Sequence, residues 1–142
     1  IFEENWGDSS YGLLLKDIRD SEVINNRFTK NSIAIYMEGS SRIAFKKNIF
    51  KKNGYGIRLQ ASCDENEFAQ NNFQLNTFDM ATNGNLVLNT INSNFWDRYE
   101  GYDLNKDGIG DVAYRPVSLY SMVVERVPGA MLLWRSFLVF LI

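Results

Sequence analysis

Hydrophobic and polar residues alternate in short runs that return along the chain every 22 residues. The apolar positions of the first set of runs are Tyr11, Leu13 and Leu15, then Ile33, Ile35 and Met37, then Tyr55, Ile57 and Leu59. A second alternating run is marked by Val23, Phe45 and Phe68. Alternation with a period of two predicts half-buried β-strands. Each repeat is therefore expected to hold short strands joined by tight corners.

Asparagine and phenylalanine follow the same period. Steps of 22 and 23 residues separate Asn26, Asn48 and Asn71, then Phe28, Phe50 and Phe73, then Asn31, Asn53 and Asn76. Asparagine suits corners because it tolerates left-handed backbone and bonds its own main chain, and stacked asparagines can also bond each other. A repeat this short cannot bury its apolar face alone, but coils stacked about 4.8 Å apart can.

These patterns predict an all-β fold, a parallel β-helix. Its inward ladders are expected to be Leu13/Ile35/Ile57, Leu15/Met37/Leu59 and Val23/Phe45/Phe68. A leucine-rich repeat also accommodates a 22-residue period, but it needs a Leu-x-x-Leu-x-Leu-x-x-Asn core that these runs do not follow. We therefore favour the β-helix, with three coils over residues 11–76.

The chain divides into three predicted parts: coils over residues 1–96, an acidic loop over 97–116 and a helical apolar tail over 117–142. Residues 77–96 are expected to form a degraded last coil, in which Phe95 keeps the 22-residue step from Phe73. The first residue is Ile1 and the apolar end has no polar cap, so we expect the chain to be a piece of a longer protein.

The amino-acid composition excludes several classes of function. The 142 residues are 45% hydrophobic with a net charge of −2, which argues against disorder and against nucleic-acid binding. The chain has no histidine and one cysteine, Cys63, so internal disulfides and thiolate zinc clusters are excluded. Cys63 is expected in an exposed turn and Met37 in the core. Without histidine or paired carboxylates at repeating positions, we do not expect an enzyme.

An acidic loop carries the candidate metal chemistry. From Asp103 to Asp111 the sequence matches the first nine positions of a calcium loop. Side-chain oxygens would come from Asp103, Asn105, Asp107 and Asp111, and a backbone carbonyl from Ile109. Tyr114 stands where a bidentate glutamate is needed, so a weak Ca²⁺ site and a metal-free turn both remain open.

Charged and aromatic side chains outside the core offer two further surfaces. Lys46, Lys47, Lys51 and Lys52 form a basic stripe at consecutive corners, which we expect to be a solvated surface that protects strand edges. Trp96, Tyr99, Tyr102 and Tyr114 cluster in sequence and could stack on sugars, but we favour a role in sealing the open end of a coil. Tyr11 and Tyr55 are the aromatics in register for glycan binding on the coils.

The loop and the residues after it resemble a known family. The motif is Asn94-x-Trp96-x-x-Tyr99-x-Gly101-x-Asp103-x-Asn105-x-Asp107-Gly108-Ile109-Gly110-Asp111, followed by Tyr114–Ser121, Val124–Arg126 and Ala130–Leu133. Together these resemble the C-terminal part of NosD, the family of maturation proteins for the copper enzyme nitrous oxide reductase. Ala113 departs from the family, which usually has proline there.

The resemblance implies a right-handed β-helix in the periplasm, peripheral to the inner membrane. It also implies an ABC transporter permease and ATPase as partners, nitrous oxide reductase as client, and a role in copper-site assembly. No pair of soft copper ligands is close in this sequence. The alternative function is a carbohydrate-binding or carbohydrate-processing surface β-helix, because Asn-rich coils occur there too.

The tail is expected to hold two helices. Ser118 can cap a helix through about residue 127, and Pro128 can open a second one that is apolar on nearly every face. That helix is too short to cross a bilayer and contains Arg135, so it must be buried against protein. We expect part of it to cap the β-helix and the rest to dock on the permease. The anchoring side chains would be Met131, Trp134, Phe137 and Phe140.

Overall fold

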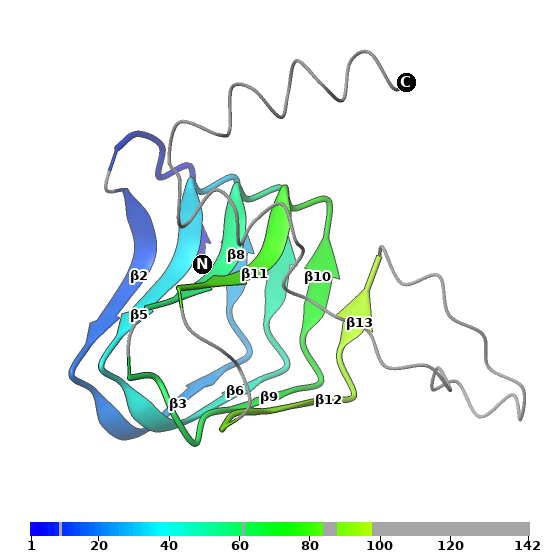
Figure 1. The fold of residues 1–142 in the computed structure, drawn as a ribbon. Coiled ribbons are helices and arrows are strands. Elements are labelled where there is room, and N and C mark those ends of the chain that lie inside the picture. Colours follow the sequence, from blue (N-terminus) through cyan, green and yellow to red (C-terminus); the bar gives the residue numbers. More distant parts are fainter. Residues whose placement is uncertain (9, 61, 84–87, 98–142) are drawn as a thin grey trace, which may run out of the picture.

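A computed structural model shows the chain wound into stacked coils with three parallel sheets (Figure 1). The structure describes residues 1–8, 10–60, 62–83 and 88–97. Each coil contributes one strand to each sheet, and neighbouring strands in a sheet come from consecutive coils. All strand pairs are parallel, which confirms the predicted parallel β-helix.

The strands fall into sheets A, B and C. Sheet A holds β1 (Phe2–Glu3), β4 (Arg27–Thr29), β7 (Ile49–Lys51), β10 (Asn72–Gln74) and β13 (Phe95–Trp96). Sheet B holds β2 (Tyr11–Lys16), β5 (Ile33–Glu38), β8 (Tyr55–Leu59) and β11 (Phe78–Thr82). Sheet C holds β3 (Arg19–Ile24), β6 (Ser41–Lys46), β9 (Glu67–Ala69) and β12 (Thr90–Asn92).

The register matches the inward ladders expected from the sequence. The ladder pairs are Leu13 with Ile35, Ile35 with Ile57, Leu15 with Met37, Met37 with Leu59, Val23 with Phe45 and Phe45 with Phe68. The core contains nearly all of these side chains, and Met37 is fully buried. The 22-residue period therefore fixes the register because each coil repeats the path of the one before it.

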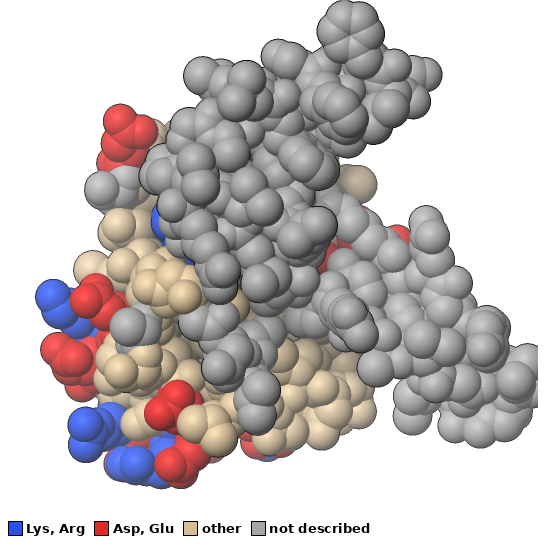
Figure 2. Space-filling model, in the orientation of Figure 1, with Lys and Arg blue, Asp and Glu red and all other residues tan. Residues whose placement is uncertain are grey.

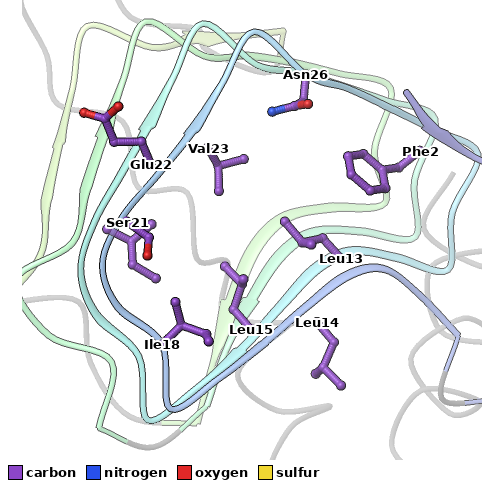
Figure 3. A pocket seen from close by; sticks show the side chains of 10 residues that line it. Phe2, Leu13, Leu14, Leu15, Ile18, Ser21, Glu22, Val23 and Asn26 are labelled. Atoms are coloured by element: carbon purple, nitrogen blue, oxygen red, sulfur yellow. The ribbon is translucent and has the colours of Figure 1, made fainter.

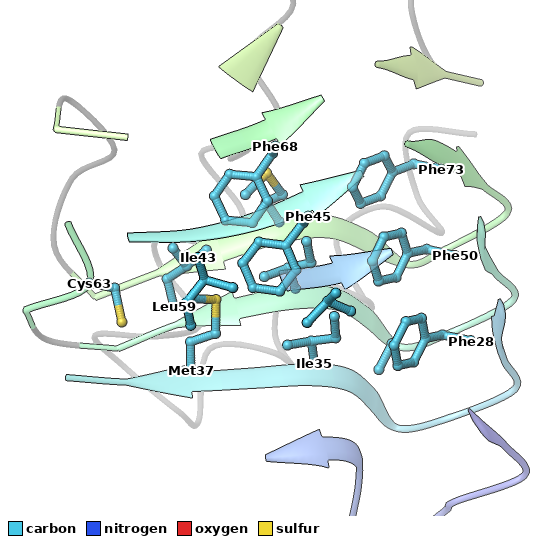
Figure 4. Close-up of a cluster of buried hydrophobic side chains, with 14 residues drawn as sticks. Phe28, Ile35, Met37, Ile43, Phe45, Phe50, Leu59, Cys63, Phe68 and Phe73 are labelled. Atoms are coloured by element: carbon cyan, nitrogen blue, oxygen red, sulfur yellow. The ribbon is translucent and has the colours of Figure 1, made fainter. Parts of the chain in front are cut away.

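Aromatic rings form two stacks inside the solenoid (Figure 4). In sheet A, Phe28 and Phe50 stack with ring centroids 5.0 Å apart, and Phe50 and Phe73 stack at 4.7 Å. In sheet C, Phe45 and Phe68 stack at 4.8 Å. The coil spacing imposes these separations, since one ring lies directly above the next.

Ladders of asparagine side chains tie the coils together at the corners. Asn53 Nδ2 donates to Phe28 O and to Asn76 Oδ1, and Asn31 N donates to Asn53 Oδ1. Equivalent bonds join Asn48 to Asn71 and Asn66 to Asn89. These buried amides satisfy main-chain groups that the corner leaves without strand partners.

The conformational reason that we expected for asparagine at the corners is wrong. The left-handed residue is the one before each ladder asparagine, as with Lys30 (φ 55°), Lys47 (φ 56°) and Lys52 (φ 58°). The ladder asparagines are absent from the positive-φ residues of the described chain. Asparagine is therefore required at these positions for its hydrogen bonds between coils, not for its backbone tolerance.

The coil after residue 76 is more regular than expected. Strands β11, β12 and β13 continue all three sheets, and β11 ends at Thr82. Phe95 lies 22 residues after Phe73, but it does not continue the Phe73 row. Phe73 pairs with Trp96 and their rings stack at 4.3 Å, while Phe95 is 55% exposed. The 23-residue step that joins Phe50 to Phe73 is repeated here, so Trp96 takes the inward position and Phe95 turns to the outer face.

The described residues contain strands, turns and bends, and no helix among them has the length and apolar character to cross a membrane. The predicted helical tail, residues 117–142, lies outside the described residues.

Candidate functional surfaces

Most of the predicted site residues lie outside the part of the chain that the structure describes. This holds for the calcium-type loop residues Asp103, Asn105, Asp107, Ile109 and Asp111, and for the tail residues Met131, Trp134, Phe137 and Phe140. Of the aromatic cluster, only Trp96 is described, and it extends the Phe28/Phe50/Phe73 stack at the last coil. The described surfaces are therefore those of the coils.

The soft donor atoms of the described coils lie in the hydrophobic core. Met37, Met80 and Cys63 belong to one buried cluster with the phenylalanine stacks (Figure 4). Within residues 1–8, 10–60, 62–83 and 88–97, no three His, Cys, Asp or Glu side chains gather closely enough to hold a metal ion. These residues do not fit a copper site, because solvent-borne copper cannot reach donors packed in a core.

The expectation that Cys63 is exposed in a turn is wrong. Its residue is 6% exposed, and its side chain points inward beside Leu59 (Figure 4). Asn89 Nδ2 donates to Cys63 O, which fastens this corner to the next coil. Burial raises the pKa of the Cys63 thiol, although backbone hydrogen bonds near Ser40 and Gly39 partly oppose the shift. A protonated thiol is a poor metal ligand and a poor nucleophile.

A hollow of about 330 Å³ opens at the N-terminal end of the solenoid (Figure 3). It is lined by the inward side chains of the first complete coil, among them Phe2, Leu13, Leu15 and Val23, with Glu22 and Asn26 at its border. These residues continue the core ladders, so the hollow is the uncovered end of the core. Most of its lining is apolar.

Charged side chains are distributed unequally around the coils. At the corner between sheets B and C, acidic and basic side chains are intermixed (Figure 2), and Arg42 Nε bonds Asp20 Oδ1 at 2.6 Å. This contact lowers the pKa of Asp20 and raises that of Arg42. Around sheet A fewer acidic side chains accompany the basic ones than at the corner between sheets B and C. Of the four lysines expected to form a stripe, Lys46 belongs to β6 of sheet C and pairs with Glu67. The other three lie around sheet A, where the fold adds Arg27 and Lys30.

The 22-residue repeat could have shown from the sequence that Arg27 and Lys30 lie beside the lysines. Lys30 lies 22 residues before Lys52, and Arg27 lies 22 residues before Ile49 in the same row of sheet A. The period also aligns Tyr55 with Phe78 in sheet B, where their ring centroids lie 5.1 Å apart. Tyr36 packs against Tyr11 at 4.9 Å although the two are not register partners. Sequence reasoning had considered only Tyr11 and Tyr55.

The fold defines a class of protein in outline: a parallel β-solenoid whose described coils present extended sheet surfaces. Residues 2–101 match the family described as periplasmic copper-binding protein (NosD). The chain belongs to this NosD family.

Two curated relatives bear the same family name. A protein of Stutzerimonas stutzeri named "Probable ABC transporter binding protein NosD" is 25% identical over 154 residues, which cover 91% of this chain and 34% of the relative. The protein of the same name from Pseudomonas aeruginosa PAO1 is 27% identical over 146 residues, with the same coverage. The chain thus spans about a third of the length of these relatives. No solved structure matches the chain.

Proposed function

We propose that this chain is part of a periplasmic β-helix scaffold that assists copper-site assembly in nitrous oxide reductase while docked on an ABC transporter. Membership of a family described as periplasmic and copper-binding carries the proposal. The relatives' names support the association with an ABC transporter. The stacked coils supply a rigid surface, because every coil is joined to the next by strand pairs and asparagine ladders.

In this proposal copper is cargo. The described coils bury their soft donors, so copper would contact residues of the protein outside them. We propose that the apolar tail (117–142) docks on the transporter and that the coils (1–96), which precede the acidic loop (97–116), are the scaffold.

The test of function is the metal content of the client enzyme. Nitrous oxide reductase should be produced in a denitrifying host whose own NosD gene is deleted, with and without the full-length protein that contains these coils. We expect copper per reductase to fall to the level of the deletion strain when the protein is omitted, and to recover when it is supplied. Full copper loading in its absence would refute the maturation role.

The acidic loop is proposed to bind Ca²⁺ weakly, with Asp103, Asn105, Asp107, Ile109 and Asp111 as ligands. We expect a dissociation constant around 10⁻⁴ to 10⁻³ M, because the twelfth position lacks a bidentate acid. Calorimetry with Ca²⁺ measures this constant, and Asp107→Ala should abolish the binding heat. If wild-type protein gives no heat with millimolar Ca²⁺, the loop is a structural turn only.

The tail is proposed to anchor the coils on the transmembrane permease through Met131, Trp134, Phe137 and Phe140. The sequence predicts a second helix that is apolar on nearly every face, which is more apolar surface than the end of one coil is expected to cover. Deleting residues 128–142 should abolish co-purification with the permease and leave the strand signal in circular dichroism unchanged. Unchanged capture of the transporter by the shortened protein would show that the tail is only a cap.

A further inference from the structure

A concentration of positive charge lies in the second and third coils. Residues 27–52 contain seven basic residues and one acidic residue, a local formal charge of +6 in a chain whose net charge is −2. Two of the basic residues are neutralised in ion pairs, Arg42 with Asp20 and Lys46 with Glu67. The other five form no ion pair with any described residue. We call these five the basic stripe: Arg27, Lys30, Lys47, Lys51 and Lys52.

The fold gathers the basic stripe on the outer side of sheet A. Strands β4 and β7 are neighbours, with Arg27 opposite Ile49 and Thr29 opposite Lys51. Phe28 and Phe50 point into the core, so the alternating side chains of Arg27 and Lys51 face outward. The remaining three lysines occupy the left-handed corner residues at the ends of these strands.

The stripe is long and narrow. Neighbouring strands lie about 4.8 Å apart, and the six residues from Lys47 to Lys52 span at most about 16 Å along the chain. Four members of the stripe are exposed and Lys51 is half-buried. Cations this close repel each other in the free protein, and a ligand that carries negative charge along the strand direction would relieve the repulsion.

Acidic residues border the stripe on both sides along the solenoid axis. Glu3 pairs opposite Thr29, and Glu4 N donates to Thr29 O on the coil before the stripe. Beyond it, Asp97 lies after β13, where its carboxylate accepts from Leu75 N. A flat anionic surface such as a membrane would meet these carboxylates as well as the lysines. An extended chain laid along β4 and β7 would meet the lysines alone.

We propose that the basic stripe binds an extended acidic peptide segment of a partner protein, whose carboxylates lie along β4 and β7. The inference goes beyond the proposed function, since it uses a surface of the coils that is separate from the tail. The proposal also assigns Lys30, Lys47 and Lys52 a binding role, whereas from the sequence we expected the lysines of this region only to form a solvated surface that protects strand edges.

The binding test uses the full chain and a fluorescein-labelled octaglutamate peptide, followed by fluorescence anisotropy. Lys30→Glu combined with Lys52→Glu reverses two charges in the stripe. Lys16→Glu combined with Arg19→Glu makes the same change in net charge at exposed residues of the corner between sheets B and C. We expect the stripe variant to weaken peptide binding at least about tenfold and the control variant to weaken it less than about twofold.

Two further readouts make the result decisive. Binding by the wild type should weaken with added salt, and the stripe variant should show a shallower salt dependence. Both variants should keep the wild-type melting temperature within a few degrees, because all four residues are exposed. Equal weakening by both variants, or no binding of the peptide by the wild type, would overturn the proposal. Stripe-dependent binding to vesicles containing phosphatidylserine, with no peptide binding, would instead identify a membrane surface.

Discussion

Phe50→Ala is expected to lower the free energy of unfolding by about 3–5 kcal/mol. The Phe50 side chain is fully buried and stacks on both Phe28 and Phe73. Alanine would leave a cavity between two coils that strand pairing holds at a fixed spacing, so the site can collapse very little. Each lost ring contact adds about 0.5–1.5 kcal/mol to the cost. Urea unfolding followed by circular dichroism measures the effect.

Two matched variants separate packing from the simple loss of a ring. Phe45→Ala removes an equally buried ring that stacks on Phe68, and it should cost less than Phe50→Ala, whose ring stacks on two partners. Phe95→Ala removes a ring that is 55% exposed, and should change stability by no more than about 0.5 kcal/mol. If Phe95→Ala were as costly as Phe50→Ala, the assignment of the inner and outer faces of the last coil would be wrong.

Asn53→Ala should be nearly as damaging, although it removes a polar side chain. Its amide accepts from Asn31 N at 3.0 Å and donates to Phe28 O at 3.0 Å, both in the buried interior. Alanine leaves those two main-chain groups without partners, and each orphaned group costs about 1–3 kcal/mol. We therefore expect a total loss of about 2–6 kcal/mol, measured by urea unfolding at neutral pH.

Asn5→Ala is the control for this ladder. Asn5 stands at the exposed end of the same row, where water replaces the bonds that its side chain makes to Asn31 and Glu3. The expected cost is below about 1 kcal/mol. Asn53→Asp adds a second comparison, because aspartate keeps the acceptor but loses the donor to Phe28 O. A tolerated Asn53→Ala would show that the ladder bonds are not needed between these coils.

The repeat in the sequence determined the fold and its register. Coils that stack by simple translation place residues 22 or 23 apart side by side, so a period in the sequence is a list of neighbours in space. This is why the inward ladders through Ile35, Met37 and Phe45 follow from the pattern alone. The resemblance to the family could also be seen in the sequence, because the motif that begins at Asn94 is a run of neighbouring residues and needs no contact between distant ones. The family match itself covers residues 2–101.

The tertiary structure decided what happens where the repeat is irregular. At the 23-residue steps, the backbone of the corner sets which way a side chain turns, and period counting cannot supply those angles. Cys63 therefore faces the core and not the solvent, and Trp96 replaces Phe95 in the aromatic stack. The ladder asparagines follow left-handed residues and do not occupy that conformation themselves.

For surface charge too, the sequence determines one part and the tertiary structure decides the other. The lysines of the third coil are close to one another in the sequence. They share one surface with Arg27 and Lys30 only because β4 pairs with β7. The pairs that neutralise Arg42 and Lys46 also depend on contacts between coils. The sequence by itself thus determined which residues repeat. The tertiary structure decided which charges remain unpaired, because electrostatic pairing depends on distance in space and not on position along the chain.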